Sequence, residues 1–163
     1  MIYLKEPITN IIAQFDNEDQ IGAGFSDWEV LTQDEVNNYE LSQAKLDKIA
    51  QVRVNRDSWM YQPVTYATRP YTATKIAGDN LVSAARSPRN IAIGFVNWMT
   101  DDGMAIELLI SEMEDIINLI EDQRSYSYFH EATLVSEINA IEIIPEVTYE
   151  QAIIALNNIN ITF

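Results

Sequence analysis

FVNWMTDDGMAIELLISEMED, residues 95–115, contains two short apolar runs, a turn between them and the start of a helix. The runs FVNWM and MAIEL flank the turn, and an Asp-Gly pair at such a place favours a β-hairpin, because Asp102 and Gly103 both tolerate a positive φ. Beyond the second run, Ile110, Met113 and Ile117 recur at helical spacing, with acids mostly on the other face. The segment therefore predicts a hairpin whose second strand runs directly into an amphipathic helix.

Further along the chain, the pattern predicts two more helices. Arg124 is a favourable residue at the negative end of a helix, so we expect the first helix to end there and a second to cover residues 126–141. Pro145 interrupts the pattern. The sequence TYEQ, which starts at Thr148, is a capping box and predicts a short final helix that ends near Leu156.

Before the hairpin, the chain begins with 31 residues that have no sustained period, and we expect short strands and turns there. TQDE, which starts at Thr32, is a second capping box. It predicts a helix that runs toward Trp59, with Arg53 and Asp57 as an i, i+4 ion pair and Pro63 as its outer limit. Residues 63–74 are rich in Thr, Tyr and Val and predict two short strands or a hairpin. Residues 75–85 predict a modest helix, and the sequence RSPRN a turn or the start of a helical turn.

These elements predict an α+β fold that is mostly helical, with one or two short β-hairpins and a C-terminal group of three helices. For the domain organisation, we expect an irregular or β N-terminal attachment segment over residues 1–31 and one α+β domain over residues 32–163.

Composition excludes several classes of function. The chain has no cysteine and a single histidine, which leaves no disulfides, no thiolate metal sites and few catalytic triads. It shows neither a signal peptide nor an apolar run long enough to span a membrane, so we expect a soluble protein of the cytoplasm. The net charge of −15 argues against binding to nucleic acid or to anionic membranes. Charge is unevenly spread: −8 over residues 1–44, +5 over residues 45–100 and −12 over residues 101–163.

The acidic residues and the histidine do not form a recognisable catalytic motif. Asp101 and Asp102 do not begin a calcium loop, because Gly103 and Ala105 stand where oxygen ligands are needed. Glu112 and Asp115 share a helix face that we expect to be solvated, and His130 lacks the second histidine of a zinc hydrolase motif. We therefore expect no catalytic residues, no metal ligands and no cofactor. An enzyme that uses the scattered carboxylates is the weakest alternative.

One segment combines aromatic side chains with positive charge, and it is the predicted partner-binding surface. Its members are Trp59, Tyr61, Tyr66, Arg69 and Tyr71, and Trp98 of the predicted hairpin joins them. Such residues can stack on bases, but in a chain of this charge we interpret them as core or protein-interface aromatics.

The order of features from about residue 45 to residue 156 resembles a domain-of-unknown-function family found on bacteriophage tail-fibre and tail-fibre-assembly proteins. The resemblance rests on KIAQVRVNRDS, VTYATRPY, TKIAGDNLVSAA, the W-x-T-x-x-G hairpin at Trp98, IELLISEMEDI, ATLVSEINAIE and VTYEQAIIAL. Two places depart from the pattern: Leu109 stands where a Thr or Ser helix cap is expected, and Arg69-Pro70 interrupts a turn that usually contains Gly.

The resemblance implies a virus-encoded, non-catalytic protein that works beside a tail fibre. Our first hypothesis is a structural adaptor of the virion tail that binds a tail-fibre or baseplate protein, with a homo-oligomer, plausibly a trimer, as a further expectation. The alternative is a tail-fibre assembly chaperone that acts in the host cytoplasm and is not retained in the virion.

Overall fold

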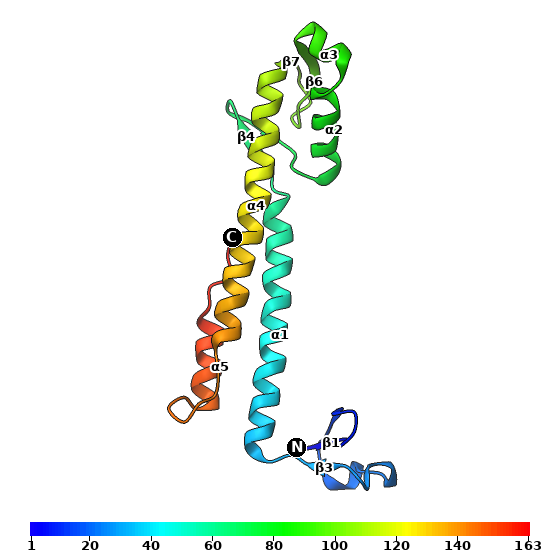
Figure 1. Ribbon diagram of the computed structural model, residues 1–163, viewed down its shortest axis with the longest axis vertical. Helices are drawn as coiled ribbons and strands as arrows, with labels where there is room; N and C mark the ends of the chain where they lie inside the picture. The colour runs from blue at the N-terminus through cyan, green and yellow to red at the C-terminus, as the bar shows by residue number, and fades with distance from the viewer. The chain divides into compact units, whose positions relative to one another are not determined.

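The computed structural model describes all residues, 1–163, and shows an α+β fold that is mostly helical (Figure 1). Three small antiparallel sheets accompany five α-helices. The chain divides into two compact units, the first made of residues 1–48 and 138–159 and the second of residues 49–137 and 160–163. The predicted domain boundary at residue 31 coincides with no edge of these units and stays a prediction.

The first unit opens with a three-stranded sheet in the order β2-β1-β3, with every pair antiparallel. Its strands are β1 (Ile2–Lys5), β2 (Ile12–Phe15) and β3 (Glu29–Val30), and two 3-10 turns lie between β2 and β3. Leu4, at the centre of β1, is buried and pairs with Ala13 on one side and with Val30 on the other. The short strands and turns predicted for the first 31 residues are confirmed.

Both predicted capping boxes are present. Helix α1 (Gln33–Met60) begins after Thr32, whose amide donates to Glu35 Oε2 over 2.8 Å, while the Glu35 amide donates to Thr32 Oγ1 over 3.4 Å. Helix α5 (Tyr149–Asn158) begins in the same way, with Thr148 and Gln151 in the two roles. Each box satisfies two amides that have no partner inside their helix, which explains why these two helix starts could be predicted from four-residue motifs.

One carboxylate ties three elements of the first unit together. Tyr3 of β1 donates its hydroxyl to Glu40 Oε1 over 2.6 Å, and Tyr149 of α5 donates to Glu40 Oε2 over 2.9 Å. The hydrogen bond to Glu40, helped by burial, raises the pKa of Tyr3 to about 12. Burial, and then the bond to the same carboxylate, raises the pKa of Tyr149.

The second unit contains the short elements predicted for residues 63–109. They are β4 (Val64–Tyr66), β5 (Arg69–Tyr71), α2 (Lys75–Ala85), α3 (Pro88–Ile93), β6 (Phe95–Met99) and β7 (Ala105–Leu109). They pack around a core of nine buried residues: Val64, Tyr71, Ala73, Leu81, Ala85, Leu108, Met113, Ile116 and Ile120. The predicted strands and the helix over residues 75–85 are confirmed.

The β6–β7 hairpin forms as predicted, although only one residue of its Asp-Gly pair adopts a positive φ. Gly103 has a φ of 79°, while Asp102 has no positive φ. The side chain of Asp102 instead accepts a hydrogen bond from Thr100 Oγ1, which also donates to the Met104 carbonyl over 2.8 Å. Thr100 is almost fully buried, so this turn is held by a side-chain hydroxyl as well as by glycine.

Helix α4 (Ile110–Ala140) corrects the prediction of a helix end at Arg124. The two helices expected over residues 110–141 are one helix of 31 residues, so the C-terminal group contains two helices and not three. The Arg124 guanidinium does not cap a helix end; its Nη2 donates to the Ala73 carbonyl over 2.9 Å. Ser127, fully buried, donates its hydroxyl to the Arg124 carbonyl over 2.6 Å, which satisfies the hydroxyl within the helix.

None of the helices carries the long, nearly uncharged apolar run that a membrane crossing requires.

The bond between Tyr3 and Glu40 makes the stability of the first unit sensitive to alkaline pH. Because the folded-state pKa of Tyr3 lies above the ordinary value of 10.0, the associated stability is complete below pH 10 and is lost as the pH rises through about 12. We expect Tyr3→Phe to lower the free energy of unfolding by about 1–2 kcal/mol at neutral pH and to flatten its decline in alkali. Denaturant unfolding followed across this window measures both effects, and an unchanged alkaline decline in Tyr3→Phe would contradict the assignment.

Candidate functional site

The carboxylates that looked like candidates for chemistry have structural hydrogen-bond partners. Asp101 Oδ2 accepts from Thr72 Oγ1 over 2.6 Å, and Asp102 accepts from Thr100 Oγ1. The latter bond, with a smaller contribution from the charge of Arg69, holds the pKa of Asp102 below its usual value. No group of three or more His, Asp or Glu side chains is placed to hold a metal ion. Asp101 therefore fastens the β6–β7 turn to the segment after β5, while Asp102 holds the turn itself.

Glu112 begins α4 in place of the missing Thr or Ser cap. Its Oε2 accepts a hydrogen bond from the Leu109 amide over 2.8 Å, which is the half of a capping box that needs no hydroxyl. Leu109 can therefore keep an apolar side chain at the junction between β7 and α4. Glu112, which lies in the first turn of the helix predicted from the sequence, thus stabilises the junction between β7 and α4.

His130 lies in a row of aromatic rings on one side of α4. Its ring stacks on Tyr126, with centroids 5.8 Å apart, and meets Phe163 edge to face at 4.9 Å. Its Nε2 is 3.0 Å from the Thr162 carbonyl oxygen, and Asn55 Nδ2 donates to the Ile161 carbonyl over 2.9 Å. The only histidine of the chain thus helps to hold residues 161–163 in place within the second unit.

Four of the six predicted partner-binding residues, Tyr66, Arg69, Tyr71 and Trp98, are turned toward the core. Tyr71 is 3% exposed and belongs to the buried cluster, and Trp98 is half-buried against the same cluster. Arg69 is half-buried, with its Nη1 atom enclosed and without a hydrogen-bond partner. These residues were selected for their aromatic or positively charged side chains, but the sequence could not show which face of each strand the core would cover.

The other two, Tyr61 and Trp59, do not belong to that cluster, and the hydroxyl of Tyr66 reaches outward from it. Tyr61 is 40% exposed just after the end of α1. Trp59 is half-buried beside Tyr126 of α4, with ring centroids 5.4 Å apart, and the Tyr66 hydroxyl donates to Asp115 Oδ2 over 3.3 Å. Trp59 and Tyr66 therefore contact the same helix, while the six residues together do not form one surface. Their role in binding a partner stays a prediction.

Exposed apolar side chains stand on the neighbouring α3 and on the outer side of the β6–β7 hairpin, which also carries Asn97 and Glu107. Strand alternation turns Val96, Trp98, Ile106 and Leu108 toward the core. It leaves Met99 and Leu109 outside, 63% and 50% exposed, with Met104 of the turn 51% exposed. Two residues of α3, Ile91 and Ile93, are 56% and 49% exposed. We call these five residues the hairpin face: Ile91, Ile93, Met99, Met104 and Leu109.

A second exposed surface runs along α4 and was missed by the sequence analysis. Leu119, Tyr126 and Phe129 are 38%, 52% and 73% exposed; at helical spacing Asp115 precedes them and Asp122 lies between Leu119 and Tyr126. We call these five residues the α4 stripe. A search for a second helical repeat along residues 113–134 could have found this pattern. The predicted helix break at Arg124 placed its residues on two separate helices.

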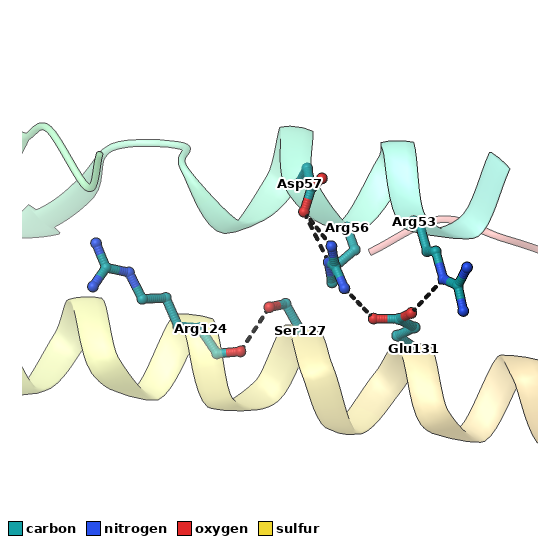
Figure 2. A network of polar contacts seen from close by, with 6 residues as sticks. All are labelled: Arg53, Arg56, Asp57, Arg124, Ser127 and Glu131. Atoms are coloured by element: carbon teal, nitrogen blue, oxygen red, sulfur yellow. Dashed lines mark hydrogen bonds and ion pairs between the residues drawn. The ribbon is translucent and has the colours of Figure 1, made fainter. Parts of the chain in front are cut away.

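A polar network in the second unit links α1 and α4 (Figure 2). Arg56 and Arg53 both reach from α1 to Glu131 of α4: Arg56 Nη1 contacts Oε2, and Arg53 Nε donates to Oε1 over 3.2 Å. Arg56 Nη2 also donates to Asp57 Oδ1 over 2.5 Å. Burial works against the charge of Arg56, but its bonds to Asp57 and Glu131 outweigh that effect and raise its pKa.

The network corrects the predicted pairing of Arg53 with Asp57. Arg53 pairs with Glu131, 78 residues away, and Asp57 pairs with its neighbour Arg56. Side chains of Arg56 and Glu131 are only 16% and 14% exposed, so each charge is largely removed from water and depends on the other. Arg53, at 61% exposed, contributes from the rim.

Comparison with known proteins gives one match. A family model described as Domain of unknown function (DUF4376) matches residues 43–155, which include the hairpin face and the α4 stripe. No curated protein matches the chain. No solved structure matches it either.

Loss of Glu131 should destabilise the protein far more than loss of Arg53. We expect Glu131→Ala to lower the free energy of unfolding by about 2–3 kcal/mol, because it leaves the largely buried charge of Arg56 with the more exposed Asp57 alone. Arg53→Ala should cost less than about 1 kcal/mol, as exposed ion pairs do. Chemical denaturation of the two variants at equal ionic strength measures the difference, and equal losses would mean that Arg56 does not depend on Glu131.

Proposed function

We propose that this chain, which belongs to the DUF4376 family, is a non-enzymatic structural protein of a bacteriophage tail. It joins a tail-fibre or baseplate protein through protein–protein contacts. The tail context comes from the resemblance of residues 45–156 to domains on tail-fibre and tail-fibre-assembly proteins. The role of adaptor is supported by exposed apolar surface on the second unit.

The observation that carries the proposal is the hairpin face. Five large apolar side chains, each about half exposed or more, belong to one hairpin and the short helix before it, with Asn97 and Glu107 between Met99 and Leu109. Apolar surface gathered in this way on a folded protein marks an interaction site more often than scattered apolar residues do. Met99 and Met104 add unbranched, adaptable side chains, which suit a surface that must fit a partner.

The hairpin face is also held firmly enough to act as a rigid surface. Trp98 and Leu108 anchor the inner side of the hairpin in the core, and Thr100 holds the turn. Glu112 fixes the junction with α4 through the Leu109 amide. A surface whose backbone is already ordered loses less conformational entropy when it binds. In this proposal Trp98, a predicted contact residue, supports the surface from behind.

The proposal predicts that the protein is retained in virions and that the hairpin face is needed for retention. We expect mass spectrometry of virions purified from the phage that encodes the chain to find it at a stoichiometric level. Met99→Asp combined with Leu109→Asp should reduce its amount in the virion at least tenfold, because burying two carboxylates in an apolar contact is costly. The control is Ile154→Asp on α5, which is 59% exposed and far from the hairpin in sequence.

Three outcomes separate the possibilities. Absence of the wild-type protein from virions would contradict the structural role. If omission of the protein at the same time lowers the yield of soluble trimeric fibre on co-expression, the chaperone alternative replaces it. Equal incorporation of the hairpin variant and of wild type would remove the hairpin face from the proposal, provided that circular dichroism shows both to be folded.

A further inference from the structure

Helix α4 carries two apolar seams, and only one of them is filled by the rest of the second unit. The filled seam contains Met113, Ile120, Ser127 and Leu134 at intervals of seven, all less than 5% exposed. The α4 stripe repeats the same spacing on another side of the helix, with steps of 4, 3, 4 and 3 residues from Asp115 to Phe129. Steps of 3 and 4 are the spacing with which one helix packs along another.

From this arrangement we propose that the α4 stripe binds a helix of a partner protein, one whose apolar residues recur every 3 and 4 positions and are flanked by Lys or Arg. The inference goes beyond the proposed tail function, because it concerns a different surface and does not depend on what the hairpin face binds. From Asp115 to Phe129 the stripe is about 21 Å long at 1.5 Å per residue, so a partner helix of roughly four turns covers it.

Exposure of the aromatic members shows why a partner would gain by covering them. Phe129 is 73% exposed and Tyr126 is 52% exposed, and aromatic side chains at such positions dominate the energetics of interfaces. The surroundings are ordered: Trp59 packs on Tyr126, and the Tyr66 hydroxyl donates to Asp115 at the other end of the stripe. Two residues that the sequence analysis chose for partner binding, Trp59 and Tyr66, thus border the stripe.

Charge decides the chemistry of the occupant. Asp115 and Asp122 stand within the stripe, neither belongs to an ion pair, and residues 101–163 carry a net charge of −12. Covering these carboxylates with an apolar or acidic helix would remove them from water without compensation. Lys or Arg beside the apolar residues of the partner would compensate them and would also steer its approach.

The same charges disfavour a second copy of this chain as the occupant. If the stripes of two copies met, four aspartates would be enclosed in one contact. Both copies also carry a charge of −15. A basic amphipathic helix avoids both costs.

The test uses the full-length chain and three synthetic 18-residue helical peptides labelled with a fluorophore. The first has Leu at 3 and 4 spacing flanked by Lys, the second has the same composition with the Leu spacing scrambled, and the third has Glu in place of Lys. Fluorescence anisotropy should show that the first peptide binds at least tenfold more tightly than either of the others. Amide chemical shifts should move along residues 115–129 of α4 when it binds.

Variants of the stripe, each with a matched control on the same helix, locate the contact. Phe129→Ser should weaken binding of the first peptide about tenfold or more, since it removes an apolar ring that the peptide would cover. The control Tyr128→Ser, which removes an aromatic ring 53% exposed on another side of α4, should leave binding unchanged. Asp122→Lys should weaken binding, and Glu114→Lys, which makes the same charge change at an exposed position outside the stripe, should have a smaller effect.

Any of the following results would overturn the proposal. Equal binding of the Leu-spaced and scrambled peptides would show attraction by charge alone. Binding that is unchanged by Phe129→Ser, or absent for all three peptides, would show that the stripe is not a helix-binding surface. Self-association of the chain that Phe129→Ser abolishes would assign the stripe to a second copy. None of these results bears on incorporation into virions, which tests the tail function separately.

Discussion

The continuity of α4 through Arg124 and Ser127 is the constraint on which the rest of the second unit depends. A helix that stopped at Arg124 would remove Glu131 from its place opposite Arg56 and leave the guanidinium of Arg56 without its main partner. Three polar groups make the uninterrupted helix possible. Ser127 bonds within the helix, Arg124 reaches the Ala73 carbonyl, and Glu131 accepts from α1. Polar residues at buried positions are costly unless they are paired in this way, and when paired they specify one alignment of the helices over others.

Because α4 is continuous, it positions both exposed surfaces. At the start of α4, Glu112 accepts a hydrogen bond from the amide of Leu109, the last residue of β7. This bond fixes the hairpin face to the start of the helix. Further along, the α4 stripe extends across the point at which a break was predicted, and Tyr126 and Phe129 lie beyond that point. The chain thus presents apolar side chains that include methionine on its hairpin, with Glu107 between them, and an aromatic, acidic surface on its helix. Two chemically different surfaces on one ordered unit suit a protein that joins two partners.

Features set by neighbouring residues could be predicted from the sequence. The capping boxes at Thr32 and Thr148, the turn at Gly103 and helix α2 all depend on contacts within a few positions, and the structure contains each of them. Features set by distant residues could not be predicted. Arg124 is typical of a helix end in the sequence, but in the structure its guanidinium donates to the carbonyl of Ala73, 51 residues away. Arg53 pairs with Glu131 and not with the nearby Asp57. For the same reason the sequence could not show which predicted contact residues are exposed: pairing of β5 with β4 turns Tyr71 into the core, and nothing local to Tyr71 indicates that direction.

The most direct test is a measurement of the backbone of α4 around Arg124, by NMR Cα chemical shifts together with amide hydrogen exchange in the full-length chain. The account predicts helical shifts without interruption from Ile110 to Ala140. It also predicts that the amides of residues 124–131 are protected as strongly as those near Ile120, because they lie in the middle of one packed helix. Non-helical shifts or rapid exchange at residues 124–126 would show two helices with a break between them. That result would contradict the ion-pair network and the α4 stripe together.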